Sequence, residues 1–329
     1  MKAMVFDARE YDRASLNEVN ARFGHDLRFQ RSNLDHTTAA LARGVDAVIP
    51  FVNDSLDEPT LRILAKEGVR LVAMRCAGHN NLDCAAARRL GLRAVNVPAY
   101  SPHAVAEHVF ALLLGLVRNV ARARERVRDG NFSIEGLSGF NLYGKTFGLV
   151  GMGHIGLCVA QIARGVGCRV IAHDPYARGS DLPAELVELD RLLAESDVVS
   201  LHAPLTKETR HLIDAARLSR MKPGAVLINT SRGALVDTAA LIDALKERRL
   251  GGVGLDVYEE EAGVFYHDLS NDLLDDDVLA RLLMFRNVLV TSHMGFLTRE
   301  ALRDIAEATL GSLSDFEAGR PLAREILRD

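Results

Sequence analysis

The sequence lacks the runs of basic residues with which proteins follow a phosphate backbone. Its 329 residues include 40 lysines and arginines against 44 aspartates and glutamates, so the formal net charge is -4 at pH 7. Both signs are spread along the whole chain. Nucleic acid is therefore not an expected partner.

Long apolar runs are also missing. The longest, Val109 to Val117, has about half of the roughly 20 residues that a membrane span needs, and we expect it to be a buried helix. The first residues read directly as a strand and lack the charged head, apolar stretch and cleavage site of a signal peptide. We expect a cytoplasmic protein without a membrane partner.

Cysteine is scarce, and its spacing suggests neither disulfides nor metal ligands. The four cysteines are Cys76, Cys84, Cys158 and Cys168, and none belongs to a CxxC or zinc-ligand pattern. Disulfides are disfavoured in a cytosolic protein, so we interpret all four as reduced packing residues. The histidine spacings likewise predict no metal site.

Two series of alternating strands and helices are present, which is typical of parallel sheets covered by helices. With 48% hydrophobic residues, the chain can bury two cores at roughly 150 residues per domain. The first series has strands near 4–6, 27–29, 47–51, 71–75 and 94–97. The second has strands near 146–150, 169–173, 198–202, 226–230, 253–257 and 288–291. The sequence predicts an α/β fold with two parallel-sheet domains.

Two helices mark the borders of these series. Ser101 and Pro102 suit the N-cap and first position of a long apolar helix that runs to about Arg128, and we expect a domain boundary there. Residues 298–318 have an apolar helical face but no strand of their own. This last helix must therefore pack on a domain already built.

A glycine-rich fingerprint opens the second series. A strand ending at Val150 leads into Gly151-Met152-Gly153-His154-Ile155-Gly156, and a helical stretch follows. Glycines at this spacing let backbone approach a pyrophosphate, which the exposed N–H groups of the helix attract. Asp174 stands 18 positions after Gly156 (174 minus 156), where a carboxylate binds ribose hydroxyls and repels a 2′-phosphate. This favours NAD over NADP as cofactor; the alternative is a glycine turn in an unrelated parallel unit with Asp174 merely solvated.

Three polar residues follow later strands of the same series. They are Arg232, Glu261 and His293. Because open parallel sheets bind ligands beyond the carboxyl ends of their strands, we expect these residues to meet. Reduction of a 2-keto acid needs a cation for the carboxylate, a proton donor for the carbonyl oxygen and a group that keeps the donor charged. Arginine, histidine and glutamate supply these services in that order. Alone, each would more often be a surface ion pair, a structural histidine or a solvated acid.

Several segments together resemble the D-2-hydroxyacid dehydrogenase family, and within it the bacterial fermentative D-lactate dehydrogenases. In the second half they are residues 229–237 (NTSRGALVD), 254–259 (GLDVYE) and 291–296 (TSHMGF). In the first half they are residues 51–54 (FVND), 75–81 (RCAGHNN) and 97–100 (VPAY). The resemblance covers essentially the full chain.

The resemblance implies two Rossmann-like or flavodoxin-like parallel-sheet domains with an active-site cleft between them. Residues 1–100 plus 298–329 would form a discontinuous catalytic, substrate-binding domain, and residues 101–297 the NAD-binding Rossmann domain. The implied activity is reversible reduction of pyruvate to D-lactate by hydride transfer from NADH. The implied partners are a small 2-keto or 2-hydroxy acid and further copies of the chain, in a dimer or tetramer.

The resemblance also assigns roles to residues. Arg232, Glu261 and His293 would be catalytic; backbone amides of Ala77 and Gly78 would bind the substrate carboxylate; Phe51, Tyr100 and Phe296 would wall the pocket. The implied cofactor-binding residues are Gly151, Gly153, His154, Ile155, Gly156, Asp174, Pro204, Thr209, Thr230, Arg232 and Asp256.

Two alternatives to pyruvate reduction stay open on the sequence. The first is a relative acting on glyoxylate or on a bulkier 2-keto acid, such as phenylpyruvate or 2-ketoisocaproate. The second is a non-catalytic NAD(H)-sensing protein like the corepressors that share the fold, since fold alone does not set function. Ser292, Gly295 and Thr209 depart from the residues common in the family. We expect these departures to affect specificity and cofactor affinity more than chemistry.

Overall fold

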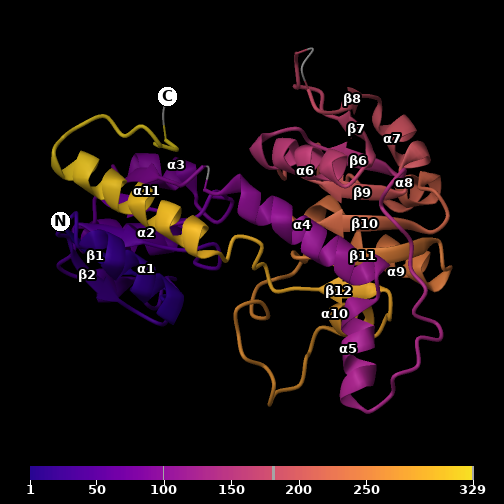
Figure 1. Cartoon of the computed structure of the whole chain (residues 1–329). Coiled ribbons are helices and arrows are strands. Elements are labelled where there is room, and N and C mark those ends of the chain that lie inside the picture. The colour runs from indigo at the N-terminus through magenta and orange to yellow at the C-terminus, as the bar shows by residue number, and fades with distance from the viewer. Residues whose placement is uncertain (99, 180–181, 328–329) are drawn as a thin grey trace. The chain divides into compact units, whose positions relative to one another are not determined.

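Two separate parallel β-sheets organise the chain, each inside its own compact unit (Figure 1). The computed structural model describes residues 1–98, 100–179 and 182–327. Unit 1 combines the described residues of Met1–Ser101 with those of Leu297–Asp329, and unit 2 is formed by those of Pro102–Phe296. The prediction of an α/β fold with two parallel sheets is confirmed.

Unit 1 has a five-stranded sheet of order β2-β1-β3-β4-β5, the flavodoxin-like arrangement. Its strands are β1 (Lys2–Val5), β2 (Asp26–Phe29), β3 (Ala47–Ile49), β4 (Leu71–Ala73) and β5 (Arg93–Val95). Its helices are α1 (Glu10–Asn20), the short 3-10 helix η1 (Ala39–Ala42), α2 (Glu58–Lys66), α3 (Cys84–Arg89) and α11 (Arg299–Glu317). The central strands consist of buried apolar residues, as expected for a parallel sheet covered on both faces.

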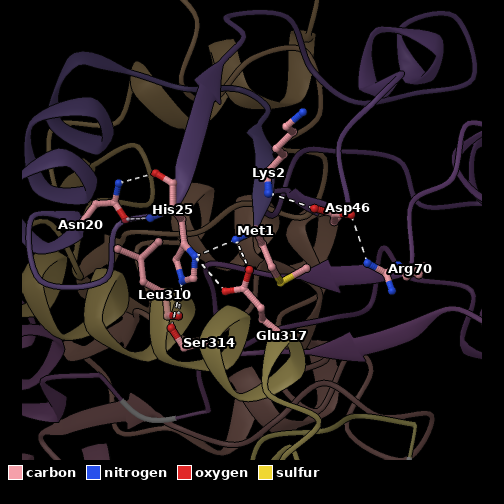
Figure 2. A network of polar contacts seen from close by, with 9 residues as sticks. All are labelled: Met1, Lys2, Asn20, His25, Asp46, Arg70, Leu310, Ser314 and Glu317. Carbon is pink, nitrogen blue, oxygen red and sulfur yellow. Dashed lines mark hydrogen bonds and ion pairs between the residues drawn. The ribbon is translucent and has the colours of Figure 1, made fainter.

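The last helix, α11, completes unit 1 although it lies some 200 residues after the rest of that unit. Its Ala306, Leu310 and Leu313 belong to the buried core formed with the strands. Polar contacts add to this packing, because Ser314 Oγ lies 3.0 Å from His25 Nε2 and Glu317 accepts a hydrogen bond from the Met1 amino group at 2.7 Å (Figure 2). A helix without a strand of its own thus covers a sheet built by the first 100 residues.

Unit 2 has a seven-stranded parallel sheet of order β12-β11-β10-β9-β6-β7-β8. The strands are β6 (Thr146–Val150), β7 (Arg169–His173), β8 (Glu185–Leu186), β9 (Val198–Leu201), β10 (Ala225–Asn229), β11 (Leu250–Leu255) and β12 (Val288–Val290). Numbered within the unit and taken from β8, the order is 3-2-1-4-5-6-7, the dinucleotide-binding arrangement with one added edge strand. The strand order reverses between β6 and β9, which is where such sheets bind ligands.

Helices cover both faces of this sheet. They are α4 (Pro102–Val117), α5 (Val120–Arg128), α6 (His154–Gly165), α7 (Leu189–Glu195), α8 (Ala215–Arg220), the 3-10 helix η2 (Gly233–Leu235), α9 (Thr238–Lys246) and α10 (Asp277–Leu283). Successive β10 residues alternate between two cores, since Leu227 packs in one and Val226 and Ile228 in the other. Both faces of the strand are therefore buried.

The prediction of one helix from Pro102 to about Arg128 is wrong. The helix breaks after Val117, because Asn119 adopts the left-handed conformation (φ +52°) and its side-chain amide donates to the Leu137 carbonyl at 3.2 Å. Among the described residues, no single helix has both the length and the apolar character to cross a membrane. Only α4 and α5 taken together meet that test, and they are bent by 59° at their break.

Candidate active site

A tight glycine turn connects β6 to α6. Gly151 has a φ of +100°, in the region that favours glycine, and a Cβ there would lie 2.7 Å from the His202 carbonyl group. A Cβ on Gly156 would lie 2.3 Å from the Gly151 carbonyl oxygen. These two glycines therefore let α6 start directly against β6 and against the loop that follows β9.

Gly153, the middle glycine, is not explained by packing inside the chain. It is the N-cap of α6, and no heavy atom of the described residues, its chain neighbours apart, lies within 4 Å of a Cβ built there. The exposed His154 and half-buried Ile155 form the first turn of the helix. Free N–H groups and the helix dipole attract anions to this end, and the bare backbone lets a pyrophosphate approach closely. The turn therefore fits a dinucleotide.

Asp174 follows β7 and stands beside this turn. Its Oδ2 accepts a hydrogen bond from the Met152 amide at 2.7 Å. Its Oδ1 accepts from the amides of Tyr176 and Ala177 at 2.8 and 3.1 Å. Partial burial acts to raise the pKa of Asp174, but these backbone donors outweigh it and lower the pKa below its usual value. The lowered pKa keeps this carboxylate ionised at neutral pH, and the Arg178 guanidinium is turned to nearby backbone carbonyls.

The carboxyl ends of β9 and β10 continue the same edge of the sheet. Ser231, after β10, donates from its hydroxyl to the Ala203 carbonyl, after β9, at 2.8 Å. The Ala203 amide lies 2.9 Å from where a Cβ on Gly151 would be. Four strand spacings of about 4.8 Å separate β6 from β12, so the edge extends for about 19 Å. The loops that follow β6, β9, β10, β11 and β12 thus lie along one edge of the sheet, beginning at the glycine turn, and we call this edge the shelf.

At the far end of this shelf, the structure brings His293 and Glu261 together. His293 Nδ1 lies 2.8 Å from Glu261 Oε2, and the two side chains are only 19% and 18% exposed. The other carboxylate oxygen, Oε1, accepts a hydrogen bond from the Tyr258 amide at 3.0 Å. Because Nδ1 is engaged by the carboxylate, Nε2 is the ring nitrogen left to hold or transfer a proton.

The backbone of His293 is strained and held in place. Its φ is +55°, a conformation that costs a non-glycine residue about 1–2 kcal/mol. Its N–H donates to the Asp256 carbonyl at 2.7 Å, and its carbonyl accepts from the Tyr266 hydroxyl at 2.8 Å. Strain of this kind persists where surrounding bonds fix the geometry, as at many functional sites.

The Asp256 carboxylate supports the turn that carries His293. It is 1% exposed, and its Oδ1 accepts from the Thr291 hydroxyl at 2.6 Å and the Met294 amide at 2.9 Å. Its Oδ2 accepts from the Gly295 amide at 2.8 Å, and His108 Nε2 lies 3.3 Å from Oδ1. Burial acts to raise the pKa of Asp256, but its bonds to His108, Thr291 and the backbone outweigh burial and lower the pKa. A Cβ on Gly295 would lie 2.9 Å from Oδ2, which explains why this position holds glycine.

Arg232 follows β10, the strand beside β11. Its side chain is half-buried and one guanidinium nitrogen donates to the Ser231 carbonyl at 2.7 Å. The next residue, Gly233, packs so closely that a Cβ there would lie 2.0 Å from the Tyr258 carbonyl group. Since the Tyr258 amide donates to Glu261, the turn that carries Arg232 packs against the loop that positions Glu261.

Three further predicted cofactor residues lie on the shelf. The Thr230 hydroxyl is buried and has no hydrogen-bond partner within the described ranges, so it has bonding capacity left for a ligand. Thr209 closes the loop after β9 instead: its hydroxyl donates to the Pro204 carbonyl at 2.7 Å and accepts from the Thr206 amide at 2.7 Å. The departure at Thr209 thus serves the loop's own structure.

The predicted substrate residues of unit 1 follow the carboxyl ends of β3, β4 and β5: Phe51, Ala77, Gly78 and Tyr100. Phe51 is buried, and the Arg75 guanidinium lies 4.4 Å from its ring centroid. Phe296 is buried in unit 2. Ala99, from the 97–100 segment, lies outside the described residues. The substrate contacts of these residues stay predictions.

Two of the residues that hold His293 were not predicted from the sequence. His108, on α4, lies 3.0 Å from the Thr291 hydroxyl, and Tyr266 bonds the backbone of His293. These partners are far apart in the sequence and share no motif spacing. The many acidic residues between 259 and 277 indicate a surface loop, but nothing in that segment singles out Tyr266.

Comparisons with known proteins agree with this geometry. The family model described as "D-isomer specific 2-hydroxyacid dehydrogenase, NAD binding domain" matches residues 110–295. D-lactate dehydrogenase of Escherichia coli is 48% identical over 329 residues, covering 99% of this chain and 100% of the relative. The solved pyruvate reductase of Chlamydomonas reinhardtii superposes with a TM-score of 0.92 at 41% identity, covering 98% of each chain. D-lactate dehydrogenase of Lactobacillus jensenii, solved with NAD+, gives a TM-score of 0.84 at 31% identity over 100% of both chains.

Proposed function

This chain belongs to the D-isomer specific 2-hydroxyacid dehydrogenase family, and from that membership we propose that it is an NAD-dependent D-lactate dehydrogenase. The reaction is the reversible reduction of pyruvate: pyruvate, NADH and a proton give D-lactate and NAD+. The observation that carries the chemistry is the 2.8 Å contact between His293 and Glu261 on the carboxyl edge that starts at the glycine turn.

His293 acts as the acid of the reduction. When bound, NADH supplies the hydride that adds to the substrate's carbonyl carbon. His293 Nε2 then gives its proton to the carbonyl oxygen, and in the reverse direction it takes the hydroxyl proton back. Glu261 accepts the hydrogen bond from His293 Nδ1–H, which fixes the orientation of the ring and leaves Nε2 for the proton transfer.

Arg232 binds the substrate carboxylate. A guanidinium offers two parallel N–H donors to a carboxylate, and its charge also polarises the neighbouring carbonyl group. The half-buried position strengthens both effects, because water screens the charge less there. We assign the glycine turn to the pyrophosphate and the Asp174 carboxylate to the adenosine ribose, which excludes NADP by repulsion.

We also propose that the protein is a homo-oligomer. Large apolar side chains are exposed along α5 and the loop after it: Val120 (56%), Val127 (49%), Phe132 (75%) and Ile134 (85%). Neighbouring exposed apolar residues in such numbers mark association surfaces. Sedimentation velocity of the parent and of the double variant Phe132→Ser/Ile134→Ser tests this. The parent should sediment as a dimer or tetramer and the variant as a smaller species; a monomeric parent contradicts the assignment.

A substrate panel tests the proposed activity. NADH oxidation is followed with pyruvate, glyoxylate, phenylpyruvate and 2-ketoisocaproate in turn, and the lactate formed is resolved into enantiomers. Pyruvate should give the highest kcat/KM, with D-lactate as product. A higher kcat/KM for a bulkier acid or for glyoxylate would show that this other acid is the preferred substrate, within the same family. NADH binding without turnover of any acid contradicts an enzyme and points to a sensor protein.

A further inference from the structure

A pocket lies at the opposite edge of the unit 2 sheet. It has a volume of about 730 Å³ and is lined at its floor by Val226, Leu250 and Val288, which stand at or near the amino ends of β10, β11 and β12. The catalytic shelf is at the carboxyl ends of the same strands. β11 alone, with six residues, separates the two edges by about 20 Å. We call this cavity the basic pocket.

Positively charged side chains gather around the basic pocket, and no negatively charged side chain of the described residues lines it. Its charged lining residues are Arg122, Lys246, Arg248, Arg281 and Arg286. Within the described ranges, no aspartate or glutamate lines it, and none of its four arginines forms an ion pair. Lys246 pairs with Asp243 at 2.9 Å, but that carboxylate is 71% exposed. Such a concentration of one sign is unexpected in a chain with a net charge of -4.

Helix polarity explains only part of this cluster. Lys246 and Arg281 stand in the last turns of α9 and α10, where a cation complements the helix dipole. Arg122 stands in the first turn of α5, where a cation is unfavourable. Arg248 has a φ of +57°, a conformation that glycine would adopt at lower cost. Helix polarity and backbone conformation therefore do not account for arginine at those two positions.

Hydrogen bonds and close contacts fix the segments that line the pocket. Arg122 donates to the Asn119 side chain at 3.1 Å, and Asn119 in turn donates to the Leu137 carbonyl of the returning loop. Gly139 lets that loop pass the end of α4, since a Cβ there would overlap the Val117 carbonyl. The Arg281 guanidinium lies 5.3 Å from the Phe285 ring centroid. The break between α4 and α5 and the loop after α5 thus hold the pocket open.

We propose that the basic pocket binds a small polyanion with at least two phosphate or carboxylate groups. Its volume is in the range of small-molecule sites, roughly 300–1,000 Å³. Arginines bind phosphate and carboxylate through paired N–H donors, and several around one cavity suit a ligand with more than one anionic group. Because the pocket is separate from the catalytic shelf, this ligand is neither substrate nor cofactor.

Calorimetric titration of the NADH-saturated protein tests the proposal. NADH occupies the glycine turn, so that added anions report on other sites. The probes are tripolyphosphate and citrate, each at matched ionic strength against sodium chloride. The test variant is Arg248→Gly/Arg286→Ala, which removes two exposed, unpaired charges and relieves the strained φ at position 248. The control is Arg164→Ala, which removes one exposed, unpaired arginine elsewhere in the same unit.

We expect a binding isotherm with at least one probe, and the responding probe identifies a phosphate or a polycarboxylate ligand. Each lost charge-assisted contact should raise the Kd about tenfold, so the double variant should lose about 100-fold in affinity. The control should bind the polyanion as the parent does, and all three proteins should bind NADH equally. No isotherm with either probe, or equal affinity in the double variant, overturns the proposal. A changed sedimentation coefficient with unchanged polyanion affinity also overturns it, because the arginines then belong to a contact between subunits.

Discussion

Replacing Glu261 by glutamine removes a charge from the proposed catalytic pair of Glu261 and His293 while keeping the shape of the side chain. The remaining carbonyl oxygen can still accept from the Tyr258 amide, which leaves the amide NH₂ facing His293 Nδ1. A hydrogen bond to a charged group is worth about 1.5–3 kcal/mol, and both side chains are less than 20% exposed. At about 1.4 kcal/mol per factor of ten, kcat/KM for pyruvate should fall about 10- to 150-fold.

The division of the loss between kcat and KM provides a second readout of the same variant. Glu261 contacts His293 and has no proposed contact with the substrate carboxylate, so the loss should lie in kcat, with KM for pyruvate nearly unchanged. Initial rates of NADH oxidation over a range of pyruvate concentrations measure both parameters. Glu260→Gln is the matched control, because Glu260 is the exposed neighbour of Glu261. If both variants keep the parent's kcat and KM, the proposed coupling of Glu261 and His293 is refuted.

Three other substitutions test separate parts of the site. Arg232→Lys should lower kcat/KM for pyruvate about 100-fold or more, since lysine lacks the paired donors, with NADH affinity unchanged in a fluorescence titration; normal activity would remove the carboxylate role. Asp174→Ala should raise the ratio of kcat/KM with NADPH to that with NADH, and an unchanged ratio would contradict the ribose assignment. Asp256→Asn should lower the free energy of unfolding by about 3 kcal/mol, because bonds to the carboxylate are lost. The Tm of unit 2 should then fall by about 6–12 °C at neutral pH. The pKa of Asp256 is lowered in the folded protein, so the ionised carboxylate stabilises the fold above the ordinary pKa of 3.8, and this stabilisation is lost as the pH falls through the lowered pKa. The difference in Tm between the parent and the variant should therefore shrink on acidification, and a constant difference would contradict this role of the carboxylate.

The strands of both sheets could be predicted because buried parallel strands are short apolar runs between turn residues. Residues 146–150 and 169–173 coincide with β6 and β7. β8 could not be predicted, since its two residues, Glu185 and Leu186, are both exposed and carry no apolar pattern. The break after Val117 was equally hidden, because it depends on an asparagine bonded to a carbonyl 18 positions further on.

The candidate site, like the fold, could be predicted from the sequence only in part. The meeting of Glu261 and His293 could be predicted because each follows a strand, and parallel strands place their carboxyl ends at one edge. The catalytic roles of these two residues and of Arg232 stay predictions. What could not be predicted is how His293 is held. Its left-handed backbone and the buried Asp256 carboxylate that fixes the following amides are tertiary features with no spacing in the sequence. The basic pocket likewise joins five separate segments of the chain.

We infer that the site of Arg232, Glu261 and His293 directs the nicotinamide hydride to the carbonyl carbon of pyruvate. The most direct measurement supplies pyruvate and NADH deuterated at the transferring position of C4, and determines the label and the configuration of the product by mass spectrometry and chiral chromatography. We predict D-lactate with one deuterium at C2, and no labelled product from the His293→Ala variant. Unlabelled lactate, L-lactate, or labelled D-lactate from His293→Ala at the parent's rate would contradict it.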